Sequence, residues 1–193
     1  MPNEDYSLGK LATDSRRYTT STKNEEIRFV CWGGRMRINV TKKGELRAIY
    51  ELTCSKEKHV IIRDIITKII KASPGTRYPI LFKEWDANER KFKPISSLSF
   101  VKDDKNVYHI ELRYQQVTYE AIIRGPGDID IGSTPMSDSD RSYYGILDLD
   151  RFIRESVPIL EILTNKKVER PSGGVTTSTP SEGSRSNEAD DLF

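Results

Sequence analysis

Residues 35–52 read RMRINVTKKGELRAIYEL, and their alternation of apolar and polar side chains decides the fold class. A period of two is the pattern of a β-strand that buries one face. The turn residues Lys42-Lys43-Gly44 separate two such runs and predict a β-hairpin. The apolar residues of its first strand share one face, so Arg35 and Arg37 are expected on the other.

The pattern continues on both sides of this hairpin. Upstream, residues 27–32 predict a third strand, joined through Gly33-Gly34. Downstream, isoleucines at helical spacing within residues 57–72 predict a helix that Ser55 caps and Pro74-Gly75 ends. The first half of the chain therefore consists of strands followed by a helix.

The second half repeats this order. Four further strands are predicted at 78–85, 97–102, 107–114 and 117–124. Residues rich in Gly, Pro, Ser and Asp then predict a long loop over 125–142, followed by a short strand at 145–147. A helix is expected to open at Asp148, with a kink or break at Pro158. Two strand-then-helix units make an α+β, antiparallel, β-rich fold.

Both ends of the chain lack apolar periodicity. Residues 1–24 are predicted to be a flexible arm, whose Arg16-Arg17-Tyr18 cluster is compatible with nucleic-acid contact. Residues 25–167 form the predicted core. Residues 168–193 are predicted to be a disordered linker with an acidic tip, because their Ser, Thr, Gly and Pro cannot bury enough apolar surface to offset the entropy of ordering.

Composition excludes several classes of protein. The chain has 193 residues, 31% of them charged, and its apolar runs are shorter than the roughly 20 residues of a membrane span. The N-terminus lacks the pattern of a secretory signal. Two cysteines are too few for a disulfide framework. A soluble cytoplasmic protein with no membrane partner is expected.

The net charge of +2 conceals a strong asymmetry along the chain. Residues 23–125 hold 21 basic and 13 acidic side chains, whereas residues 126–193 hold 7 basic and 13 acidic ones. A basic body with an acidic end favours a polyanionic partner, although an ordinary solvated surface can have the same balance.

The sequence lacks the usual catalytic and metal-binding patterns. His59 and His109 are the two histidines, and neither lies at a zinc-ligand spacing. There is no phosphate-binding loop motif, and the acidic residues within 128–140 do not match a calcium-binding EF-hand. The chain is expected to be no enzyme and to use no metal or cofactor.

Cations and aromatic side chains recur on the predicted strands. Proteins that bind single strands without sequence preference combine a cationic groove for the phosphates with aromatic rings on which bases stack. The candidate nucleic-acid-binding residues are Arg28, Trp32, Arg35, Arg37, Arg47, Tyr50, Lys83, Trp85, Arg113 and Arg124. The aromatic members of this set are also suited to the core.

The last residues of the sequence carry a more specific pattern. Asp190 and Asp191 precede Leu192 and Phe193, so carboxylates surround an apolar pair that suits a partner pocket with a basic rim. Together with Glu188, this ending resembles the acidic tails of bacterial and bacteriophage single-stranded DNA-binding proteins. The resemblance implies that the tip recruits replication, recombination and repair enzymes and can compete with DNA for the basic face. Leu192 departs from the Pro-Phe ending common in bacterial members.

Two folds fit this order of elements. Strands, a helix rich in isoleucine and further strands resemble an OB-fold barrel with an added C-terminal helix. Two strand-then-helix units resemble the Whirly and positive-cofactor type of single-strand binder, in which each sheet leads into a helix. That second fold expects four strands in the first half, where the sequence shows three.

The function expected from these features is non-catalytic binding and protection of single-stranded DNA in replication, recombination or repair. The alternatives are a protein–protein adaptor or inhibitor with a basic sheet surface, and an RNA-binding regulator. Sheet edges and apolar helix faces leave a homo-oligomer open.

Overall fold

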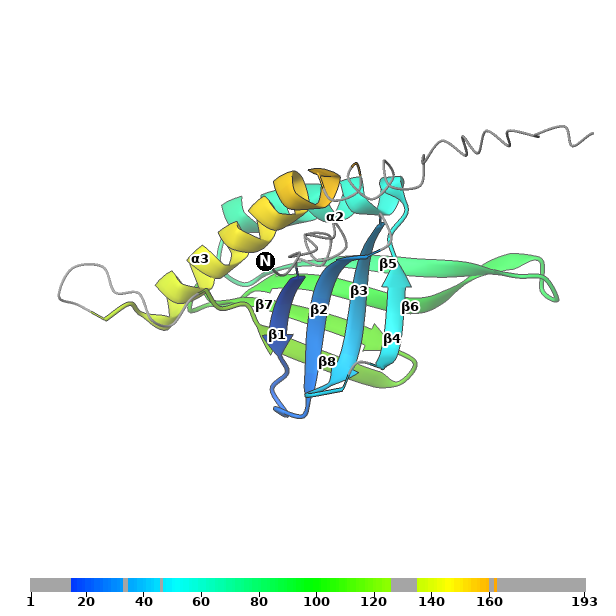
Figure 1. The fold of residues 1–193 in the computed structure, drawn as a ribbon, viewed down its shortest axis with the longest axis horizontal. Coiled ribbons are helices and arrows are strands. Elements are labelled where there is room, and N and C mark those ends of the chain that lie inside the picture. Colours follow the sequence, from blue (N-terminus) through cyan, green and yellow to red (C-terminus); the bar gives the residue numbers. More distant parts are fainter. Residues whose placement is uncertain (1–14, 33–34, 46, 126–134, 160–161, 163–193) are drawn as a thin grey trace, which may run out of the picture.

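The computed structural model describes residues 15–32, 35–45, 47–125, 135–159 and 162. Its strands form two four-stranded antiparallel sheets, each in the order of the chain (Figure 1). The first sheet comprises β1 (Ser15–Thr19), β2 (Glu25–Trp32), β3 (Arg35–Lys42) and β4 (Ala48–Thr53). The second comprises β5 (Thr76–Asp86), β6 (Lys91–Lys102), β7 (Tyr108–Tyr114) and β8 (Val117–Ile122). Helix α2 (Lys56–Lys71) follows the first sheet; α3 (Asp138–Arg151) and the π-helical segment η1 (Phe152–Ser156) follow the second.

This architecture confirms the α+β, antiparallel, β-rich class. The predicted hairpin is β3 and β4, and α2 begins after Ser55, whose side chain accepts a hydrogen bond from the Lys58 amide. The alternative OB-fold places a helix between the third and fourth strands of one barrel. Here α2 lies between the fourth and fifth strands, which belong to different sheets.

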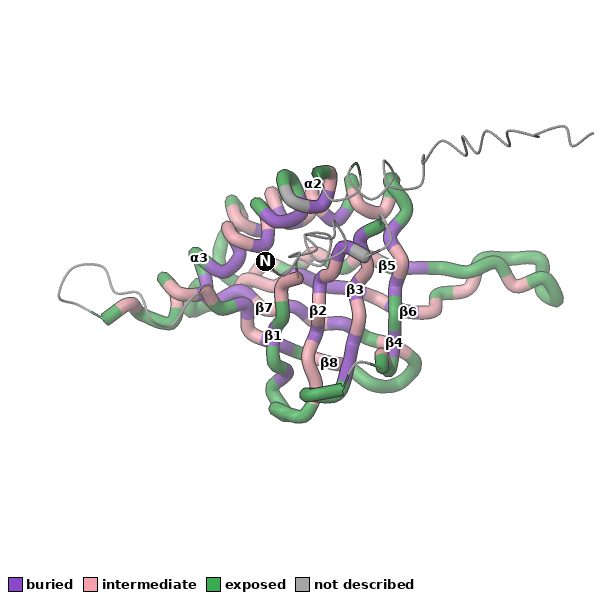
Figure 2. The backbone as a smooth tube through the Cα atoms, in the orientation of Figure 1, coloured by how far each residue is buried: buried purple, intermediate pink, exposed green. Residues whose placement is uncertain are grey.

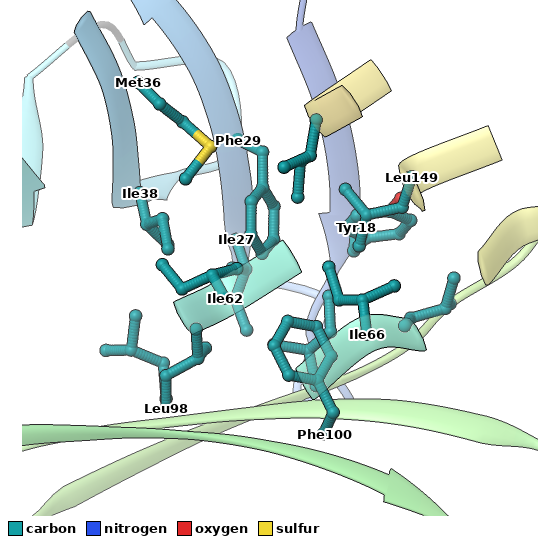
Figure 3. Packing of buried hydrophobic residues seen from close by; sticks show 14 of the residues in the cluster. Tyr18, Ile27, Phe29, Met36, Ile38, Ile62, Ile66, Leu98, Phe100 and Leu149 are labelled. Atoms are coloured by element: carbon teal, nitrogen blue, oxygen red, sulfur yellow. The ribbon is translucent and has the colours of Figure 1, made fainter. Parts of the chain in front are cut away.

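The hydrophobic core lies between the inner faces of the two sheets and the helices (Figure 3). Phe29 of the first sheet and Phe100 of the second have ring centroids 6.5 Å apart, and Ile66 of α2 is buried in the same cluster. Buried and less buried residues alternate along the strands of the first sheet (Figure 2). The outer face of each sheet therefore remains open to binding.

The prediction of a flexible arm over residues 1–24 is wrong for residues 15–19, which form strand β1. It pairs with β2 along its whole length, so the ordered region begins no later than Ser15. Tyr18 is buried in the core, and the Arg16 guanidinium lies 2.5 Å from the Asp148 carboxylate of α3. Besides its pairing with β2, one apolar side chain and one ion pair hold this strand in place. Apolar periodicity could not reveal it for that reason.

Helix α3 begins ten residues before the Asp148 start that the sequence predicts. The sequence predicts a loop to residue 142 and a strand at 145–147, but α3 begins at Asp138 after its N-cap Ser137. A Cβ at Gly145 would lie 2.6 Å from the Arg124 carbonyl carbon, so glycine lets α3 pack directly on the chain that leaves β8. Glycine also has low helix propensity, which hides the helix in the sequence.

The break predicted at Pro158 takes the form of a local change of helical pitch. Proline has no N–H, and its ring crowds the preceding turn. Directly before it the helix widens into η1, where the Val157 N–H donates to the Phe152 carbonyl. Phe152 and Val157 nevertheless stay buried. In the described part of the chain, every helix is too short or too polar to cross a lipid bilayer.

Candidate nucleic-acid interface

The outer face of the first sheet carries rows of polar residues fixed by strand register. One row runs from Arg17 through Arg28 and Asn39 to Glu51. Arg17 and Arg28 are direct cross-strand partners, and like charges in that position are unfavourable unless an anion compensates them. The next row contains Arg37, and beyond it Arg35 pairs with Trp32. We call this surface the arginine face; it comprises Arg17, Arg28, Arg35, Arg37 and Asn39.

Part of the charge on the arginine face is compensated within the sheet. Arg28 lies 2.8 Å from Glu26, with only 12% and 14% of the two side chains exposed. Arg37 lies 2.7 Å from Glu51. The exposed Arg17 and Arg35 have no side-chain hydrogen bond or ion pair with any described residue. These two cations are therefore available to a phosphate.

Two polar atoms on the same face lack partners in the described chain. The Arg37 Nε and the Asn39 Oδ1 are shielded from solvent and make no hydrogen bond. Buried polar atoms usually have a protein or water partner, so each such atom needs an explanation. An ordered water molecule is the ordinary explanation.

A second basic feature lies where the edge strands β1 and β8 meet. Thr20 forms an isolated bridge with Ala121, and the Ser21 amide donates to the Glu120 carbonyl at 2.8 Å. A groove of about 580 Å³ follows this seam. Its cationic side chains are Arg17, Lys23, Lys43 and Arg124. We call it the seam groove; because Arg17 belongs to both features, it is continuous with the arginine face.

The acidic side chains beside the seam groove are held near His109. The Nε2 atom of His109 lies 3.1 Å from Asp103 Oδ2. The Nδ1 atom lies 3.2 Å from Glu120 Oε1, without the alignment of a hydrogen bond. Partial burial opposes ionisation of Asp103, but the Val107 amide and His109 together keep its pKa below the usual value. Of the two acids only Glu120 lines the groove, together with His109, so cations outnumber anions there.

Two exposed tyrosines stand close to the Arg124 end of the seam groove. Tyr143 and Tyr144 lie on α3 in an edge-to-face pair with centroids 5.8 Å apart. A Cβ at Gly125 would lie 3.4 Å from the Tyr144 Cβ, which places this tyrosine against the residue that follows Arg124. The sequence assigns these residues to the approach of a strand; recognising Ser137 as a helix N-cap would have revealed their position.

The remaining candidate residues fall elsewhere. Tyr50 is a correction: it is buried, stacks on Tyr114 with centroids 4.3 Å apart, and its hydroxyl lies 2.6 Å from Ser96 Oγ. The regular register of β3 and β4 pairs Tyr50 with Val40, and both are buried. Burial also raises the pKa of the Tyr50 hydroxyl.

The structure does not gather the other candidates into one site. Arg47 is exposed just before β4, while Arg113 lies on the outer face of the second sheet. Lys83 and Trp85 lie on the far part of β5. Trp32 pairs with Arg35 of the arginine face, but its side chain is outside the described residues, as are Asp190, Asp191, Leu192 and Phe193.

Comparison with known proteins gives little guidance. No protein-family model and no curated protein matches the sequence. Among solved structures, the chain is similar to one described as crystal structures of Trypanosoma bruciei MRP1/MRP2, with a TM-score of 0.41 and 7% sequence identity. The match covers 82% of this chain and 88% of that chain. So weak a likeness carries no argument about function.

Proposed function

We propose that this chain binds single-stranded DNA without catalysing a reaction, along a track that runs from the arginine face into the seam groove. The observation that carries the proposal is the position of Arg17. It opposes Arg28 directly on the arginine face and also lines the seam groove. Glu26 already compensates Arg28, so Arg17 is the cation of this pair that remains for a phosphate, and a strand bound there could continue along the groove toward Lys23 and Lys43.

The surroundings of the track favour a single strand over a duplex. Single-strand binding combines cations for the backbone with aromatic rings that stack on unpaired bases. Tyr143 and Tyr144 supply exposed rings near Arg124, at one end of the groove. In a duplex the base faces are already stacked on one another, so these rings would add little.

The layout of the chain is compatible with a Whirly-like binder. Two strand-then-helix units are the hallmark expected of that type, and β1 supplies the fourth strand of the first sheet. We further propose that the protein protects single-stranded DNA during replication, recombination or repair. In this proposal the acidic ending Asp190 to Phe193 recruits the enzymes of those processes.

The proposal is tested by fluorescence anisotropy with labelled oligo-dT. Affinity should fall by at least about tenfold between roughly 50 and 200 mM salt, because each neutralised phosphate releases a counterion. Arg17→Glu with Lys43→Glu should weaken binding strongly, whereas Lys68→Glu with Lys71→Glu changes the net charge equally but lies on α2, outside the arginine face and the seam groove. Salt-independent affinity, or equal losses in both variants, would contradict the proposal.

Two further comparisons separate the alternatives. A duplex of equal length should bind more weakly than oligo-dT. An RNA strand that competes better than DNA of the same length would instead identify an RNA-binding regulator. Binding of an acidic protein without binding of either nucleic acid would identify an adaptor or inhibitor.

A further inference from the structure

The second sheet carries a two-stranded extension that the first sheet lacks. Strands β5 and β6 pair with each other out to Asp86 and Lys91, but β6 pairs with β7 only as far as Ser96. Residues 83–94, which we call the distal ribbon, therefore project past the sheet (Figure 1). The register shift between Phe82 and Lys83 marks the base of this ribbon.

The two faces of the distal ribbon differ in chemistry. Side chains alternate along β5, so Leu81, Lys83 and Trp85 share the outer face of the sheet. Their cross-strand partners at the tip side are Pro94 opposite Lys83 and Phe92 opposite Trp85. The opposite face carries only charged residues, namely Glu84, Asp86, Lys91 and Lys93.

The charged face is neutralised by its own ion pairs. Lys93 lies 2.7 Å from Asp86 and also contacts Glu89, and Lys91 lies 2.6 Å from Glu89. Hydrogen bonding to Asp86 and Glu89 raises the pKa of Lys93, and Lys93 lowers the pKa of Asp86. These charges hold the ribbon and its turn together, so this face has little charge left for a ligand.

The aromatic face, in contrast, is exposed. Trp85 is 55% exposed and Phe92 64%, in an edge-to-face pair with centroids 5.3 Å apart. At the base, Leu81, Pro94, Ile95 and Arg113 line a shallow groove of about 250 Å³. The side chains of Lys83 and Arg113 have no hydrogen bond or ion pair with any described residue. Aromatic rings and available cations thus lie together, while the acids of the ribbon occupy its other face.

We propose that the distal ribbon is a base-stacking arm that takes one or two unpaired bases on Trp85 and Phe92, with Lys83 and Arg113 near their phosphates. The proposal rests on the proposed function, since it names a second contact for the same single strand. Charge decides against the main alternative occupant. Within residues 83–94 the face that holds the rings carries Lys83 and no acid, so the same face of a second copy would add a cation and no anion, whereas a nucleic acid supplies anions and aromatic rings together.

Such an arm divides recognition into two chemically different parts. The track on the first sheet senses phosphate charge and weakens as salt rises. The arm senses base faces, and stacking on an aromatic ring depends little on the base identity. A strand that keeps its phosphates but lacks bases should therefore lose the contribution of the arm together with that of Tyr143 and Tyr144.

The test compares oligo-dT with an abasic strand of equal length and charge. The wild-type chain should prefer oligo-dT by about tenfold or more. Trp85→Ala with Phe92→Ala should reduce this preference severalfold, to the part that Tyr143 and Tyr144 supply, and leave affinity for the abasic strand unchanged. Trp85→Phe, which retains a ring, should keep most of it. Val60→Ala with Ile61→Ala, which trims exposed apolar side chains on α2, serves as the matched control.

The fluorescence of Trp85 gives a readout that does not depend on affinity. Saturating oligo-dT should quench the component that is lost in Trp85→Phe, and saturating abasic strand should not. Equal affinity for both strands without this quenching would overturn the arm while leaving salt-dependent binding, and hence the proposed function, intact. Failure to bind either strand at low salt would overturn both. A dimer in sedimentation that Trp85→Ala dissociates, with unchanged strand preference, would assign the ribbon to self-association instead.

Discussion

The two sheets have the same number and order of strands, yet they present different outer surfaces. The first sheet carries the arginine face, where polar residues alternate with buried ones and two acids partly balance the cations. The second sheet carries exposed apolar side chains, including Leu81, Trp85 and Phe92, and confines most charge on its ribbon to ion pairs. The two sheets therefore share one architecture, but the outer surface of the first suits phosphates and that of the second suits bases.

The attachment of the helices differs as well. Helix α2 follows β4 after two residues, whereas α3 follows β8 after 15 residues and returns to pack on the chain at Arg124. The second unit therefore depends on close packing between segments that the chain order alone does not bring together. The comparison predicts that single substitutions affect the two units unequally.

The largest effect is expected at Gly145. Gly145→Ala places a Cβ 2.6 Å from backbone carbon of Arg124, and α3 must move away. We expect the free energy of unfolding to fall by about 3 kcal/mol or more, measured by urea denaturation. Gly44→Ala in the first unit is the control: its φ of 85° costs about 1 kcal/mol, but a Cβ there meets no atom within 4 Å. Equal losses in the two variants would show that α3 adapts freely.

The next effect separates the two outer surfaces. Arg35→Glu with Arg37→Glu should weaken oligo-dT binding by about 100-fold at low salt, or about 2.7 kcal/mol. Loss of the exposed Arg37–Glu51 pair should cost the fold less than about 1 kcal/mol. Anisotropy and urea denaturation on the same samples measure both quantities. Normal binding by a folded double variant would show instead that the phosphates bind on the second sheet.

A smaller effect tests the position of Tyr50 between the sheets. Tyr50→Phe removes the hydroxyl that lies 2.6 Å from Ser96 and leaves a buried serine without this partner. We expect a loss of about 1 kcal/mol in the free energy of unfolding and unchanged affinity for DNA. A folded variant with weakened DNA binding would show instead that Tyr50 belongs to the DNA interface.

These predictions build on a fold that the sequence predicted in part. The hairpin over 35–52, the N-cap Ser55 and the four strands of the second half are confirmed, because each carries a clear apolar period or a capping residue. Strand β1 has one buried apolar residue, and the distal ribbon has exposed residues on both faces. Neither gives the periodic signal that marks a half-buried strand.

The candidate site was predicted less completely than the fold. The outward direction of Arg35 and Arg37 follows from alternation within one strand, and the structure confirms it. The seam groove could not be predicted, because it exists only where Thr20 meets Ala121 from another sheet. Local patterns identify the face of a strand, whereas a groove between sheet edges depends on tertiary packing.

The smallest effect concerns the C-terminal residues, which lie outside the described part of the chain. Deletion of residues 171–193 removes Glu182, Glu188, Asp190 and Asp191 against a single Arg185. If this tail competes with DNA for the arginine face, affinity should rise by about two- to fivefold at low salt and not at moderate salt, where screening is stronger. Anisotropy at both salt concentrations measures the difference.

Phe193→Ala is the matching control for that deletion. It keeps every charge of the tail, so DNA affinity should stay unchanged, while capture of a replication or recombination enzyme should be lost. Deletion that abolishes DNA binding would make the tail part of the DNA site. The proposed assignment of DNA binding to the core and of enzyme recruitment to the C-terminal residues would then be wrong.

The ion pair between Arg16 and Asp148 has a consequence for synthesis on the ribosome. Its partners are 132 residues apart, so β1 leaves the ribosome long before the helix that holds it. Chains fold in the order in which they emerge at about 5 to 20 residues per second. For several seconds the nascent first sheet therefore lacks both the ion pair between β1 and α3 and the contact of Thr20 with the edge strand β8. During that interval its edge is open to pairing with another nascent chain, which makes crowded polysomes the place where misassembly of this protein should begin.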